Sequence, residues 1–327
     1  MKTMLVLSMG ALLLAGTLSA QTPVPEWQAG VDKMKSLIQT NPAQASEEVG
    51  ELLKGKNKKN VDLVTSVAHV YLDAGKLTEA QEYLAMAKKA DNKDPKVSVL
   101  EGDIALAQKN IGQACQLYEQ AIYFDPNCKE AYLKYAQAYK SASPALAIEK
   151  LEQLKAVDPN CLEADRELAE VYYSSNRFGK AAEMYAKFID TPLATEDDML
   201  KYAFALFLNH DFEKSLQVAQ KGLQKNARHA AFNRLVMYNN TDLKRYEDAE
   251  KAAHAFFNAS DRADYSYLDY RYYGALLSAL KKYDEAIIEY GKALEKDGTQ
   301  VDLWREISDA HEMNNAEFNL QMQQNSD

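Results

Sequence analysis

The sequence predicts an all-α fold of short helix pairs stacked one after another, and three observations indicate it. A small residue recurs every 33 to 37 positions along most of the 327-residue chain. Seven positions after each one, two helical turns further along the same face, stands a matching residue. Eleven or twelve positions before each one stands another, mostly small residue, which leaves room for a turn and an earlier helix. Small residues on both helices predict pairs that cross closely, with aromatic side chains beside the crossing.

Seven such pairs follow one another between about residues 61 and 300, with a period typical of helix–turn–helix repeats. The small position of the first helix holds Ala68, Gly102, Ala136, Ala169, Ala203, Met237 and Gly274. The small position of the second helix holds Ala80, Ala114, Ala147, Ala181, Ser215, Ala249 and Ala286. The matching position seven residues later holds Ala87, Ala121, Leu154, Phe188, Gly222, Phe256 and Ala293. An aromatic follows the first-helix position by three residues at Tyr71, Tyr139 and Tyr172.

The segment YRYYGALLSALKKYDEAIIEYGKALEKD (270–297) resembles the tetratricopeptide repeat in Gly274, Tyr283, Ala286, Tyr290 and Ala293. The resemblance covers about residues 61–300. It implies a right-handed superhelical solenoid of about seven full repeats plus degenerate ends. It also implies that the first helices line a concave face that binds peptide segments or protein partners. The 230–266 unit departs from the pattern, because Met237 and Asn240 replace the expected small and aromatic residues.

The two ends of the chain differ from the repeats. Residues 21–60 contain another helix pair, broken at Asn41-Pro42, whose polar outer surface is typical of an N-terminal cap. Residues 301–327 begin one more first helix with Trp304, Ile307 and His311, but their polar tail could not close a core. We interpret this end as an incomplete C-terminal repeat or cap, or as a cut through a longer array.

Residues 1–20, MKTMLVLSMGALLLAGTLSA, have an early lysine, an apolar run and small residues at the end, as a secretory signal peptide does. We expect cleavage near Ala20 and a mature chain that starts near Gln21. No later stretch is long and apolar enough to span a bilayer. The form of the signal is typical of Gram-negative bacteria, and of exported Bacteroidetes proteins. We therefore expect a periplasmic or otherwise exported protein.

Charge and motifs exclude several classes of function. The net charge of −10 is unsuited to nucleic acid, and the densest basic run, KGKNKKN (54–60), is read as a solvated loop. The five histidines show no metal-ligand spacing, and the sequence has no GxSxG, Walker or GxGxxG motif. We therefore expect no catalytic residues, no cofactor and no metal. Cys128 and Cys161 are expected too far apart for a disulfide, and Cys115 is expected in the core.

A series of arginine and aromatic residues recurs on the first helices, on the faces turned away from the crossing. Such residues are favoured as binding anchors, so we expect a partner-binding groove across residues 162–279. Phe204 and Phe207 have an alternative role, packing between neighbouring helices. The arginines favour a protein segment of acidic or aromatic character. The predicted groove residues are Arg166, Tyr173, Phe204, Phe207, Arg234, Tyr238 and Arg271.

Three classes of function remain open for such an array. The first is a periplasmic scaffold that binds protein or peptide partners, for example in envelope assembly or secretion. The second is a binder of carbohydrate or cell-wall glycan, because aromatic rings in a groove can stack on sugars. The third is the non-catalytic part of a longer enzyme. The only tryptophans, Trp27 and Trp304, lie near the chain ends and away from the predicted groove, which favours the scaffold.

Overall fold

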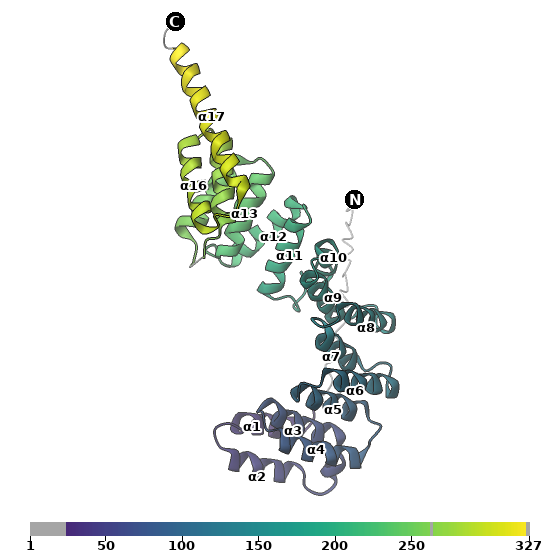
Figure 1. The fold of residues 1–327 in the computed structure, drawn as a ribbon. Coiled ribbons are helices and arrows are strands. Elements are labelled where there is room, and N and C mark those ends of the chain that lie inside the picture. Colours follow the sequence, from purple (N-terminus) through teal and green to yellow (C-terminus); the bar gives the residue numbers. More distant parts are fainter. Residues whose placement is uncertain (1–23, 262–263, 325–327) are drawn as a thin grey trace, which may run out of the picture. The chain divides into compact units, whose positions relative to one another are not determined.

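The computed structural model describes residues 24–261 and 264–324, and within them every regular element is a helix (Figure 1). The predicted fold class, an all-α array of helix–turn–helix pairs, is confirmed. The chain divides into two compact units, Met1–Leu100 and Glu101–Asp327. The predicted signal peptide, residues 1–20, lies outside the described residues.

Unit 1 begins with the pair α1 and α2, in the region predicted to cap the array, and continues with the first repeat pair. Asn41 caps α2 by accepting a hydrogen bond from the backbone N–H of Gln44, and Pro42 occupies the first helical position. The boundary between the units falls within α5. The elements are α1 (Gln28–Leu37), α2 (Pro42–Leu52), the 3₁₀ helix η1 (Gly55–Lys59), α3 (Val61–Asp73), α4 (Leu77–Ala90) and α5 (Pro95–Ala107).

Unit 2 contains the later pairs, in which odd-numbered helices are first helices and even-numbered ones second helices up to α16. They are α6 (Ile111–Phe124), α7 (Lys129–Tyr139), α8 (Pro144–Val157), α9 (Leu162–Ser174), α10 (Phe178–Phe188) and α11 (Glu196–Leu208). After them come α12 (Phe212–Lys225), α13 (Ala230–Asp242), α14 (Tyr246–His254), the π-helical turn η2 (Ala255–Ala259), α15 (Tyr267–Ala279), α16 (Tyr283–Lys296) and α17 (Val301–Gln324).

The predicted small positions lie at the helix crossings. All seven second-helix residues, from Ala80 to Ala286, are completely buried. At Gly274 an added Cβ would come within 2.7 Å of the Tyr290 ring, and at Gly102 within 2.5 Å of the Tyr118 ring. A tyrosine of the second helix therefore lies directly on the backbone of the first, and only glycine leaves room for it in these two pairs.

Met237 is a large residue at a first-helix position predicted to be small, and the residue that faces it on the second helix explains why it fits. The first-helix and second-helix residues that meet in the glycine pairs are sixteen positions apart. Sixteen positions after Met237 stands Ala253, and both side chains are fully buried in one core cluster. In this pair the large side chain is on the first helix and the small one on the second, the reverse of the glycine pairs. The total side-chain volume at the crossing is therefore conserved, as dense packing requires.

Most pairs turn through one residue in the left-handed region. Gly75 takes this conformation in the first repeat pair, with φ of 73°. In five later pairs a non-glycine residue does so, although a side chain makes this conformation costly. These residues are Lys109, Asn176, His210, Lys244 and Lys281.

The C-terminal helix α17 is a single helix of 24 residues, so residues 301–324 contain no second helix of a further pair. Leu303 and Ala310 are buried in one core cluster with Ala286, Tyr290 and Ala293 of α16. Beyond Asn314 the side chains are mainly exposed, Phe318 by 62%.

Two further expectations concern the membrane and the cysteines. Among the described helices, none is long and apolar enough to cross a membrane. Cys115, Cys128 and Cys161 form no disulfide within the part of the chain that the structure describes. Cys115 is 2% exposed, in agreement with its predicted place in the core, and burial raises the pKa of its thiol to about 11.

Candidate functional site

The three predicted groove arginines each bind a carboxylate on the next first helix. Arg166 of α9 donates from Nε to Asp198 Oδ1 of α11 over 3.0 Å. Arg234 of α13 donates from Nε to Asp269 Oδ1 of α15 over 2.7 Å. Their recurrence in the sequence therefore reflects contacts between neighbouring repeats.

The third arginine makes the same kind of bridge to the C-terminal helix. Arg271 of α15 donates from Nε and Nη2 to Glu306 of α17, with a shortest distance of 2.6 Å. The guanidinium is thereby neutralised in a two-point ion pair. The three arginines do not provide the free positive charge on which an acidic partner was expected.

The two aspartates that accept hydrogen bonds from Arg166 and Arg234 also help to cap the N-termini of their own helices. Asp198 and Thr195 form a capping box at the start of α11, and Asp269 and Ser266 form one at the start of α15. Both carboxylates are almost fully buried, Asp198 at 1% and Asp269 at 0% exposed. Buried carboxylates need full hydrogen bonding, which the cap and the arginine together supply.

Tyr238 does not stand exposed in the groove, and the expectation that it does is wrong. Its side chain is 3% exposed, and its hydroxyl donates to Asp269 Oδ1 over 2.8 Å. Its ring stacks on Tyr272 of the next first helix with centroids 3.9 Å apart. The face of α13 that points away from its own helix pair is covered by the neighbouring repeat. The positions of residues within one pair do not reveal such a contact.

The remaining predicted aromatics are half-buried. Phe207 packs against Phe212, Tyr238 and Tyr272, with centroids 5.6 to 6.3 Å apart. The alternative that Phe204 and Phe207 pack between neighbours therefore describes them well, although both keep some exposed surface. Tyr173 contacts Phe178 of α10 edge-on and also remains partly exposed.

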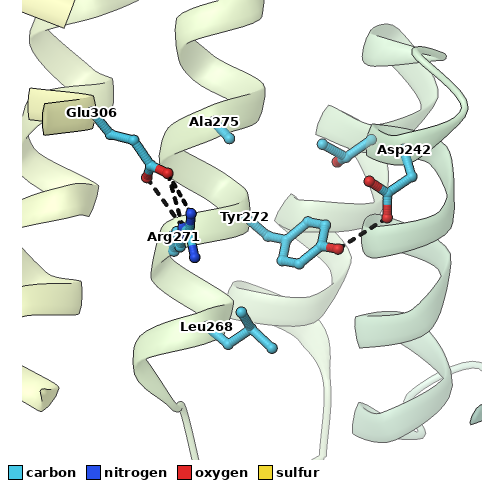
Figure 2. A pocket seen from close by; sticks show the side chains of 7 residues that line it. Asp242, Leu268, Arg271, Tyr272, Ala275 and Glu306 are labelled. Carbon is cyan, nitrogen blue, oxygen red and sulfur yellow. Dashed lines mark hydrogen bonds and ion pairs between the residues drawn. The ribbon is translucent and has the colours of Figure 1, made fainter. Parts of the chain in front are cut away.

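A pocket of about 350 Å³ lies among α13, α15 and α17, next to this aromatic cluster (Figure 2). Only Arg271 of its lining was predicted as a site residue. Tyr272 could have been found, because it stands 34 residues after Tyr238 and next to Arg271. Asp242 and Glu306 could not be found in this way, because no recurrence at the repeat period marks them in the sequence. The lining is Thr241, Asp242, Leu268, Arg271, Tyr272, Ala275 and Glu306.

A polar triad of tyrosine, carboxylate and lysine links neighbouring first helices at two places in unit 2. Tyr118 donates its hydroxyl to Asp103, which also binds Lys134 of the next first helix over 2.9 Å. The same triad recurs 67 residues later as Tyr185, Glu170 and Lys201. Its repetition indicates a structural bridge between repeats, like that of the arginines.

No metal-binding arrangement is found in the described parts of the chain, where no three His, Cys, Asp or Glu side chains come together suitably. The candidate site therefore consists of aromatic surface, ion pairs and one open pocket. This arrangement offers binding contacts.

Comparisons with known proteins give a partial match. Residues 67–127 and 136–193 match the family model of the tetratricopeptide repeat. No match was found among curated proteins.

Similar solved structures are only distantly related in sequence. A tetratricopeptide repeat protein from Parabacteroides merdae is 14% identical over 77% of this chain and 98% of its own, with a TM-score of 0.46. PilF of Pseudomonas aeruginosa is 15% identical over 63% and 96%, with a TM-score of 0.49. YrrB, described as a tetratricopeptide repeat protein with an unusual peptide-binding site, is 15% identical over 56% and 94%, with a TM-score of 0.43.

Proposed function

We propose, from the premise that residues 67–127 and 136–193 are tetratricopeptide repeats, that this protein is a non-catalytic scaffold that binds a protein or peptide segment. The binding surface is the row of first helices α9, α11, α13 and α15 in unit 2. One observation supports this location most directly. Half-exposed aromatic side chains and an open pocket occur together along these helices.

The predicted groove residues take two different roles in this proposal. Tyr173, Phe204 and Phe207 offer apolar area to a partner, since each keeps part of its surface exposed. Arg166 and Arg234 hold the helices in place by their bridges to Asp198 and Asp269.

Export is part of the proposal and is supported by the sequence alone. Residues 1–20 have the pattern of a signal peptide, so we place the scaffold in the periplasm, with envelope assembly or secretion as its field of action.

A displayed library of random peptides tests the binding function. We expect the full mature chain to enrich particular peptides, and Tyr173→Ala combined with Phe207→Ala to lose at least about tenfold in affinity for them. Gln217→Ala, an exposed change on second helix α12, is the matched control and should bind normally. If the enriched peptides bind the double variant as tightly as the Gln217→Ala control, the peptide-binding site lies elsewhere on the protein. A glycan array run beside the library tests the carbohydrate alternative.

A further inference from the structure

The pocket among α13, α15 and α17 holds more negative than positive charge. In Figure 2 the Arg271–Glu306 pair lies at one side and the Tyr272–Asp242 pair at the other, with Leu268 and Ala275 between them. Glu306 accepts hydrogen bonds from both Nε and Nη2 of Arg271, so the guanidinium is already neutralised. The charge that remains is that of Asp242.

Asp242 has no cationic side chain bound to it within the described residues. Tyr272 donates its neutral hydroxyl to Asp242 Oδ2 over 2.9 Å. Desolvation raises the pKa of the Asp242 carboxyl, against the opposing effects of Tyr272 and of the nearby His210. A carboxylate that has lost water without gaining a cation is stabilised by any cation that enters the pocket.

The aromatic wall of the pocket is rigid and suits a cation. Tyr238 covers one face of the Tyr272 ring at 3.9 Å, and Asp269 in turn holds the Tyr238 hydroxyl. Tyr272 also lines the pocket, with Leu268 beside it. Aromatic rings attract ammonium and guanidinium groups, and apolar walls accommodate the methylene stem of such a side chain.

We propose that this pocket receives one lysine or arginine side chain of the bound segment, with its charged head at Asp242 and its stem against Tyr272 and Leu268. The volume of about 350 Å³ is at the lower end for ligand pockets and suits a single side chain. An acidic side chain would face Asp242 and find Arg271 occupied by Glu306. The net charge of −10 adds general attraction for a basic segment. This inference rests on the proposed binding function and replaces the expected acidic character of the partner by a basic one.

The test uses the same displayed random library with the full mature chain, and the residues of the enriched peptides are read by sequencing. We expect one position to be fixed as lysine or arginine. Asp242→Asn, which keeps the acceptor for Tyr272, should weaken binding of the enriched peptides about tenfold, the usual effect of losing a charge-assisted contact. Glu295→Gln on α16, an exposed change of equal charge, is the matched control and should leave binding unchanged.

Three results would count against these proposals, and they separate a failure of the pocket assignment from a failure of the scaffold function. Enriched peptides without a fixed cation, or with a fixed acidic residue, would overturn the pocket assignment and leave the scaffold function intact. Asp242→Asn binding as tightly as Glu295→Gln, with both variants melting like the parent, would do the same. A library in which nothing is enriched would overturn the proposed function itself.

Discussion

Arg234 shows how one side chain can resemble a binding anchor and yet belong to the structure. It binds Asp269 twice, donates to the backbone oxygen of Asp264, and lies 5.2 Å from the centre of the Phe256 ring. Asp269 is completely buried, while Arg234 is 23% exposed in its side chain. Such a contact stabilises mainly because its loss would leave a buried charge alone.

Arg234→Ala should lower the free energy of unfolding by about 2–3 kcal/mol, because it leaves Asp269 without its cation. The measurement is denaturant unfolding followed by circular dichroism. Arg228→Ala breaks the exposed pair with Asp261 and serves as the control, with an expected loss below about 1 kcal/mol. Equal losses in the two variants would show that burial of Asp269 is unimportant.

Gly274 and Gly291 form a matched pair for testing the crossing. Gly274→Ala should cost about 1–3 kcal/mol, because its Cβ would come within 2.7 Å of the Tyr290 ring. At Gly291, on α16, an added Cβ meets nothing within 4 Å. Gly291→Ala should therefore stabilise the protein by roughly 0.5–1 kcal/mol through improved helix propensity. Thermal melts of both variants measure the difference, and a shift of the same sign in both would contradict the packing described here.

At the scale of elements, helix pairs and their crossings could be predicted from the sequence, because the spacing of small residues follows directly from helix geometry. The contacts of Tyr238 and Arg166 could not. A side chain that points away from its own helix pair can face either solvent or the next pair. The sequence of a single repeat does not distinguish exposure from such a contact. Lys109 and Lys281 in left-handed turns were equally hidden, since glycine is the residue expected there.

The exchange of large and small side chains at Met237 and Ala253 predicts a reciprocal effect. Met237→Ala should cost about 2–5 kcal/mol by opening a cavity, and Ala253→Leu about 1–3 kcal/mol by overpacking. The double variant should be more stable than the sum of the two losses implies, by roughly 1 kcal/mol or more. A double-mutant cycle of unfolding free energies measures this coupling. Strict additivity would mean that the two side chains do not share one space.

At the scale of the whole molecule, the export proposal is supported by the sequence of residues 1–20, which have a targeting pattern and lie outside the described structure. The proposed binding surface lies on the same first helices as the predicted groove, and Arg271 of that prediction lines the pocket. Asp242 and Glu306 were not found, because a carboxylate in an acidic sequence stands out only when its neighbours in space are known.

Export has a direct test. The protein expressed from its full gene in a Gram-negative host should be recovered from the periplasm with an N-terminus at or near Gln21, measured by mass spectrometry of the intact chain. An intact Met1 on cytosolic protein would remove the localisation proposal and leave the repeat fold and its pocket unaffected.

The double use of Asp198 and Asp269 has a consequence for motion. Each carboxylate caps its own helix and holds an arginine of an earlier first helix, so the first turn of α11 or α15 cannot fray without releasing that neighbour. Amide hydrogens there should exchange with solvent only in openings that involve both repeats. At the start of α12, Asp211 caps the helix, and among the described residues its ion pair is with Lys214 of the same helix, so exchange there should follow fraying of one helix alone.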